Sequence, residues 1–87
     1  GDFHVSGFVM KVYPNPFAET ATLQITNVSE LRITDFKLFD VLGQEHNIEF
    51  IRNSDRYLIR SGELASGVYI LQVETENETI SAKIVKY

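Results

Sequence analysis

The chain contains no cysteine and no tryptophan, and only two of its 87 residues are histidine. Without cysteine, a disulfide framework and a thiolate metal site are both excluded. The two histidines, His4 and His46, do not stand at the spacing of paired metal ligands, so we interpret both as surface residues. The sequence therefore predicts neither a metal site nor another cofactor.

Positive charge is also scarce. The chain has eight Lys and Arg residues and twelve Asp and Glu residues, which gives a formal net charge of −4. A negative surplus argues against nucleic acid as a partner and against attraction to anionic membranes. No apolar run approaches the roughly 20 residues that a membrane-spanning helix needs. We therefore expect no nucleic-acid partner and no direct insertion into a membrane.

Catalytic motifs are missing as well, since no nucleophile is paired with a general base at a recognisable spacing. Glu74, Glu76 and Glu78 alternate beside a predicted turn, as the oxygen ligands of calcium loops do. A solvated acidic hairpin tip is the simpler interpretation of the same pattern. The sequence thus predicts a protein that is not an enzyme.

What the chain does contain is alternation with a period of two residues, most clearly near its end. Apolar and polar residues alternate over 67–75 and again over 79–87, and three polar residues link the two runs. This pattern indicates an antiparallel β-hairpin. Two strands alone are marginally stable in water, so the rest of the chain must supply a second layer.

Further strands are predicted upstream over 8–13, 20–26, 33–40, 44–52 and 57–60, with a bulge near Thr34 and Asp35. Pro14 and Pro16 should end the first strand, since proline fixes φ and lacks an amide donor, and Phe17 should anchor that turn to the core. Together these segments predict an all-β, immunoglobulin-like sandwich of about seven antiparallel strands. We assign residues 1–8 to the remnant of a linker and residues 9–87 to the folded domain.

The alternation also predicts which side chains of the last strand are buried. Ile80, Ala82 and Ile84 should face the core, and Lys83, Val85 and Tyr87 should face outward. If so, removing residues 85–87 deletes few core contacts and costs little stability. It would still shorten a strand edge that a partner could recognise by main-chain pairing.

Three segments in this order carry a resemblance to a known family. They are Val-Tyr-Pro-Asn-Pro-Phe at 12–17, Leu-Phe-Asp-Val-Leu-Gly-Gln at 38–44, and Leu-Ala-Ser-Gly-Val-Tyr at 64–69, which continues to Lys-Ile-Val-Lys at 83–86. Together they closely resemble the type A C-terminal sorting domain of the type IX (Por) secretion system of Gram-negative bacteria. By position, the resemblance implies these recognition residues: Tyr13, Pro14, Asn15, Pro16, Asp40, Leu42, Gly43, Gln44, Gly67, Tyr69, Lys83, Val85, Lys86 and Tyr87.

The resemblance further implies a route and a set of partners. A domain of this family follows an N-terminally fused cargo and directs it from the periplasm across the outer membrane to the cell surface or the medium. Its partners would be the outer-membrane translocon, its shuttle proteins and a sortase-like cysteine protease that removes the domain and joins the cargo to lipopolysaccharide. Cleavage is expected upstream of Val9, near Ser6 and Gly7.

Other interpretations of the same residues remain open at this point. The prolines and glycines of the motifs could simply shape turns, and Tyr69 could be a core or corner tyrosine. An accessory sandwich that binds carbohydrate or mediates adhesion is an alternative function, and it would require a row of exposed aromatic residues on one face. A small hydrolase is a more remote alternative.

Overall fold

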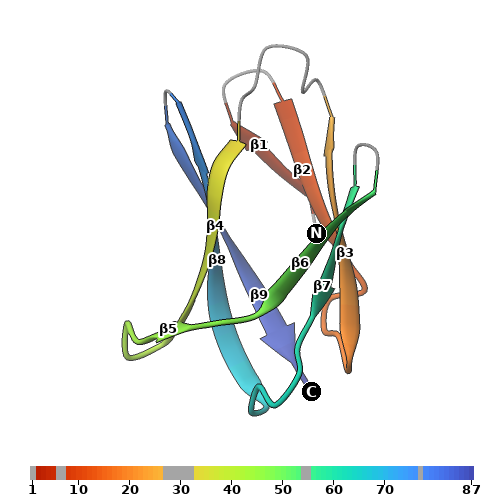
Figure 1. Ribbon diagram of the computed structural model, residues 1–87, viewed down its shortest axis with the longest axis vertical. Coiled ribbons are helices and arrows are strands. Elements are labelled where there is room, and N and C mark those ends of the chain that lie inside the picture. The colour runs from red at the N-terminus through yellow and green to blue at the C-terminus, as the bar shows by residue number, and fades with distance from the viewer. Residues whose placement is uncertain (1, 6–7, 27–32, 54–55, 77) are drawn as a thin grey trace.

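The structure, a computed structural model, describes residues 2–5, 8–26, 33–53, 56–76 and 78–87. These residues form nine β-strands and no helix, and the strands lie in two sheets that face each other (Figure 1). Within the described ranges, therefore, no helix is long and apolar enough to cross a membrane. The strands are β1 (Asp2–Val5), β2 (Phe8–Tyr13), β3 (Thr20–Thr26), β4 (Ile33–Asp40), β5 (Glu45–His46), β6 (Glu49–Asn53), β7 (Arg56–Arg60), β8 (Gly67–Thr75) and β9 (Thr79–Lys86).

One sheet has the strand order β1-β2-β3-β7-β6 and the other has the order β5-β4-β8-β9. Every neighbouring pair within the sheets is antiparallel. The prediction of an all-β sandwich with antiparallel strands is confirmed. The final hairpin, β8 and β9, forms one side of the four-stranded sheet, and the expected bulge lies in β4, where the register shifts between Ile33 and Asp35.

Two predicted segments differ from the structure, and they account for the two additional strands. The stretch 44–52 is not one strand, since β5 pairs with β4 in one sheet and β6 pairs with β7 in the other. Alternation shows which face of a strand is apolar but not which sheet the strand joins. Residues 2–5, expected within a linker remnant, form β1 and pair with β2. The division of the domain at residues 8 and 9 remains a prediction, and residues 6–7 lie outside the described part.

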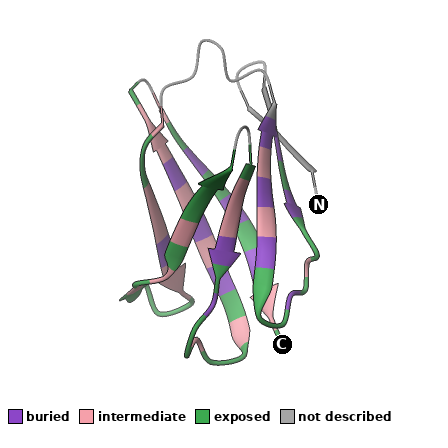
Figure 2. Ribbon diagram, turned by 45° about the vertical axis from the view of Figure 1, so that its right-hand side comes forward, coloured by how far each residue is buried: buried purple, intermediate pink, exposed green. Residues whose placement is uncertain are grey.

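The core lies between the two sheets and follows the predicted faces. Residues along β3, β8 and β9 alternate between buried and more exposed positions (Figure 2). Leu71 and Ile84, for example, are completely buried. The other buried apolar residues of these three strands are Ala21, Leu23, Ile25, Tyr69, Val73, Ile80 and Ala82. Such interdigitating inner faces are the main source of stability in a sandwich.

Aromatic residues close the core on the side of β4 and β6. The ring of Phe36 on β4 stacks on Phe50 of β6 with centroids 4.7 Å apart, and it lies tilted against Tyr57 of β7 at the same distance. All three side chains are partly buried and pack against the core. They therefore join the two sheets, and they are not part of an exposed aromatic row.

Candidate functional site

The three motif segments meet at one end of the four-stranded sheet. The pairing registers place Asp40 of β4 opposite Tyr69 of β8, and Tyr69 opposite Ile84 of β9. The Pro14–Phe17 segment reaches the same place, because Phe17 forms a parallel bridge with Lys86. We call this region, defined by the row Asp40, Tyr69 and Ile84, the motif end of the sheet. Segments that are far apart in the sequence thus become neighbours there.

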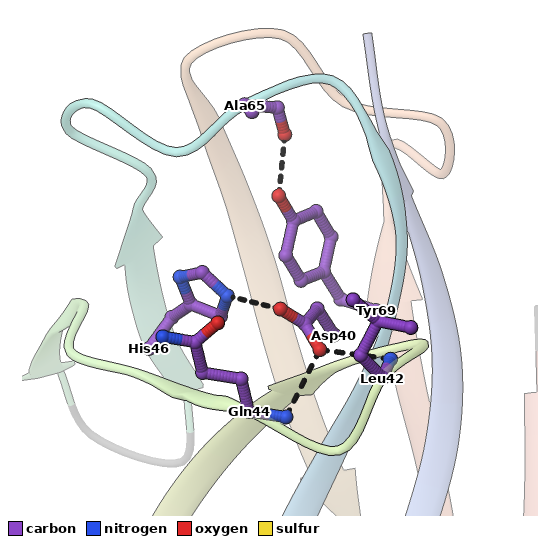
Figure 3. Close-up of polar contacts among 6 residues, drawn as sticks. All are labelled: Asp40, Leu42, Gln44, His46, Ala65 and Tyr69. Carbon is purple, nitrogen blue, oxygen red and sulfur yellow. Dashed lines mark hydrogen bonds and ion pairs between the residues drawn. The ribbon is translucent and has the colours of Figure 1, made fainter.

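The turn between β4 and β5 is organised by the carboxylate of Asp40 (Figure 3). Its Oδ1 accepts hydrogen bonds from the amides of Leu42 and Gln44, each at 2.9 Å. The main chain adds two bonds, from the Gly43 amide to the Asp40 carbonyl and from the Asp40 amide to the Gln44 carbonyl. Gly43 has a φ of 83°, in the left-handed region that favours glycine. The turn therefore has a defined shape set by its own sequence.

The second carboxylate oxygen of Asp40 binds His46 of β5. The distance from Asp40 Oδ2 to His46 Nε2 is 2.8 Å, and Nε2 donates, because a carboxylate can only accept. The hydrogen bond from His46, followed by those from the Gln44 and Leu42 amides, lowers the pKa of Asp40 below its ordinary value. The side chain of His46 is 32% exposed and is positioned by Asp40, a contact that the prediction of a surface residue did not include. His46 lies opposite Leu38 across the β4–β5 pair, a pairing that the predicted single strand over 44–52 did not specify.

Tyr69 packs beside the pair of Asp40 and His46. Its ring is buried and meets the ring of His46 edge-on, with centroids 5.6 Å apart. Its hydroxyl donates a hydrogen bond of 2.6 Å to the carbonyl of Ala65 in the turn before β8 (Figure 3). A buried tyrosine with a satisfied hydroxyl serves packing. These contacts favour the corner-tyrosine interpretation of Tyr69 over direct recognition.

At the tip of the β4–β5 turn two apolar side chains point to solvent. Val41 is 74% exposed and Leu42 is 89% exposed. Ordinary surfaces carry single exposed leucines without consequence. Here, however, the two lie next to each other on a turn whose backbone is fixed by Asp40. We call this exposed apolar pair, Val41 and Leu42, the apolar knob, and its backbone is held in one conformation by the turn.

The first motif and the last strand form a second arrangement at the motif end, which we call the clasp and define as Asn15 and Phe17 together with residues 83–87. Asn15 Nδ2 donates to the carbonyl of Lys83 at 3.3 Å, and Asn15 Oδ1 accepts from the amide of Val85 at 2.9 Å. The Phe17 amide donates to the Val85 carbonyl, and the Tyr87 amide donates to the Phe17 carbonyl, both at 2.9 Å. Phe17 itself is completely buried, as the sequence predicted for the anchor of this turn.

The clasp corrects two expectations about the last strand. Residues 85–87 lie outside the buried core, as expected, but they carry three of the four hydrogen bonds that hold the turn containing the buried Phe17, which the expected small cost of removing them left out. The outer edge of β9 over this stretch is also occupied by Asn15 and Phe17. A partner cannot pair with this edge without displacing them. The sequence missed this arrangement because the bonded residues are about 70 positions apart, as in the pair Asn15 and Val85.

The outward face of β9 is as predicted. Lys83 and Tyr87 are exposed and Val85 is half-buried, whereas Ile84 between them is buried. Lys86 is half-buried and its Nζ donates to the Tyr87 carbonyl. The remaining predicted recognition residues surround the motif end. Tyr13, Pro14, Pro16, Leu42, Gly43 and Gln44 are exposed, while Asn15, Asp40 and Gly67 are half-buried.

Elsewhere the described residues offer little chemistry. Among them, no group of three His, Cys, Asp or Glu side chains is placed to hold a metal ion. Glu74 binds Lys37 with an N–O distance of 3.0 Å, instead of joining an acidic cluster. An open polar hollow beside Glu19, Ile48 and Glu63 contains the exposed ion pair of Arg60 and Glu49. Among the aromatic residues whose side-chain burial is described, those from Tyr13 onward, Tyr13 and Tyr87 are the exposed ones, so these side chains form no aromatic row of a carbohydrate site.

Comparison with known families shows the family to which the chain belongs. A family model described as the secretion system C-terminal sorting domain matches residues 11–87, nearly the whole chain. The chain belongs to this family. A search of curated proteins finds no match. As a type IX sorting domain, the chain is a C-terminal signal for export across the outer membrane toward the cell surface or the medium, and its family is not a catalytic one.

Proposed function

We propose that this sorting domain carries an N-terminally fused cargo from the periplasm through the outer-membrane translocon of the type IX system, and that shuttle proteins and the translocon recognise its motif end. The observation that carries the proposal is the convergence of all three family motifs on one end of one sheet. This convergence gives residues of all three motifs one shared surface, which a recognition signal needs. The family match over residues 11–87 supplies the secretion system.

Two features of the motif end suit recognition. The first is the apolar knob of Val41 and Leu42, whose backbone is fixed by the Asp40 carboxylate. The second is the outward face of the last strand, with Lys83, Val85 and Tyr87. Because hydrogen bonds already hold the backbone of both features, binding does not have to order that backbone, and only the side chains lose conformational entropy. Lys83 also places a positive charge on a domain whose net charge is −4.

The later fate of the cargo follows from the same family membership. We propose that a sortase-like cysteine protease at the cell surface removes the domain and joins the cargo to lipopolysaccharide. Cleavage upstream of Val9, near residues 6–7, would separate β1 from β2 and release a signal that contains residues 9–87. The sorting domain itself contributes recognition, and the protease contributes the chemistry.

A fusion experiment tests the proposal. A periplasmic reporter followed by Gly1–Tyr87 is expressed in a bacterium that has a type IX system, and cell fractions are probed for the reporter. We expect the fusion at the surface or in the medium, and in the periplasm when the translocon is deleted. A reporter without the domain serves as the control and should stay in the periplasm. Delivery that is independent of the domain or of the translocon would refute the proposal.

The anchoring step has its own measurement. In a strain without the sortase-like protease, the exported fusion should keep its full mass and lack lipopolysaccharide. In the parent strain the reporter should lose the domain and migrate as a lipopolysaccharide conjugate. Equal products in both strains would remove the protease from the pathway while leaving the export signal intact.

A further inference from the structure

The outer edge of β9 is covered at its C-terminal end. As the last strand in the order β5-β4-β8-β9, it has no strand beyond it in its sheet. Over residues 83–87, however, the Lys83 carbonyl, the Val85 amide and carbonyl, and the Tyr87 amide are bonded to the Pro14–Phe17 segment. Since the Val85 amide faces Asn15, the alternation of an antiparallel strand turns the Ile84 amide toward β8. The end of the strand is thus held from both sides.

The side chain of Asn15 does what a strand partner would do. A carboxamide offers one acceptor and two donors, so it can bind both the Val85 amide and the Lys83 carbonyl. Its neighbours Pro14 and Pro16 have no amide hydrogen and cannot extend a β-ladder. The asparagine side chain therefore replaces the main-chain pairing that the prolines cannot provide. Phe17, buried in the core, continues the pairing with main-chain bonds of its own.

We propose that Asn15 is a positioning residue for export, and that the translocon and its shuttle proteins do not contact it. It acts by holding the backbone of residues 83–87 in the extended conformation of β9. Lys83, Val85 and Tyr87 then stay on the outward face of the sheet while Ile84 stays buried. The first family motif then works through the last one. This inference rests on the proposed function and names the residue that sets the geometry of its recognition surface.

The test compares Asn15→Ala and Asn15→Asp with the wild type in the reporter fusion. Asn15→Ala removes both bonds, so we expect the Val85 amide to exchange with solvent about tenfold faster, while the Ile84 amide keeps its protection. Reporter delivery should fall at least about fivefold if recognition follows this loss of order. Asn15→Asp keeps the acceptor for Val85 but sets an oxygen against the Lys83 carbonyl, so its delivery should lie between the two.

Substitutions in the opposite sheet show how much delivery falls when the domain is merely less stable. Ile59 is completely buried on β7, and Ile59→Val and Ile59→Ala bracket the stability of Asn15→Ala in urea unfolding. A control of equal stability should keep the protection of the Val85 amide and should deliver the reporter normally. If this control loses as much delivery as Asn15→Ala, the role of Asn15 is only structural and the proposal is overturned.

The same strains separate this inference from the function on which it rests. A reporter without residues 9–87 must fail to reach the surface for the proposed function to stand. If that reporter fails while Asn15→Ala is delivered as well as its matched control, the inference alone is refuted. If the reporter without the domain is delivered, the function itself is refuted. Normal Val85 protection in Asn15→Ala would also overturn the inference, because the clasp would then not depend on Asn15.

Discussion

Removal of the last three residues, Val85, Lys86 and Tyr87, should destabilise the sorting domain far more than their position outside the buried core suggests. The truncation deletes the Val85 amide donated to Asn15, the Val85 carbonyl bound by Phe17, and the Tyr87 amide bound to the Phe17 carbonyl. It also shortens the pairing of β9 with β8. The buried ring of Phe17 then lacks the bonds that fix its backbone.

The magnitude follows from these contacts. Three hydrogen bonds at a net 0.5–1.5 kcal/mol each contribute about 1.5–4.5 kcal/mol. Partial exposure of a phenylalanine that is worth about 1.5–3 kcal/mol when buried adds to this. The expected loss is therefore about 3–6 kcal/mol, against a total of roughly 4–13 kcal/mol for a domain of this length. A protein near the lower limit would unfold.

Urea unfolding of Gly1–Ile84 beside Gly1–Tyr87, followed by circular dichroism, measures this loss. With a slope of about 1–2 kcal/mol per molar for a small domain, the midpoint should fall by at least about 1.5 M, or no folded baseline should be seen. Tyr87→Ala is the control, since it keeps the amide that binds Phe17 and should change stability by less than about 0.5 kcal/mol. A midpoint within about 0.5 M of the wild type in the truncated chain would show that the clasp contributes little.

Three further substitutions test separate parts of the structure. Leu71→Ala, in the centre of β8, should cost about 2–5 kcal/mol in urea unfolding, and an unchanged midpoint would contradict the assigned strand faces. Gly43→Ala meets no neighbouring atom but must adopt a positive φ, so it should cost about 1–2 kcal/mol, and a neutral result would mean that the turn adopts another conformation. Asp40→Asn tests the lowered pKa of the carboxyl: the stabilisation from ionised Asp40 is present above about pH 4 and disappears as the pH falls through the lowered pKa. The difference in unfolding free energy between wild type and Asp40→Asn should thus be constant near neutral pH and shrink below about pH 4, and a difference that grows toward acid would refute the assignment.

The structure also changes how a truncation should be interpreted as a test of export. Failure of Gly1–Ile84 to reach the surface could follow from unfolding alone, because Phe17 loses its main-chain partners. Substitutions that leave the clasp bonded, such as Lys83→Ala on the outward face, address recognition more directly. The side chain of Lys83 is exposed, and the clasp uses only its carbonyl.

The sequence determined the elements and their faces. Alternation with a period of two is a local property, so the strands around Leu23, Leu38, Leu71 and Ile84 and their buried sides followed directly from it. The bulge expected near Thr34 and Asp35 lies where the register of β4 shifts. The motifs and their order also indicated the family, which the match over residues 11–87 confirmed.

Only the tertiary structure decided what these elements do together. The local residue pattern does not specify which sheet a strand joins. The sequence therefore could not show that β5 and β6 are two strands in different sheets. Nor does it contain contacts between distant segments, such as those of Asn15 with Lys83 and Val85. Folding brings the prolines of the first motif against the edge of the last strand, where a side-chain amide replaces the donor that proline lacks. For that physical reason, the positioning role of Asn15 could be seen only after both sheets were in place.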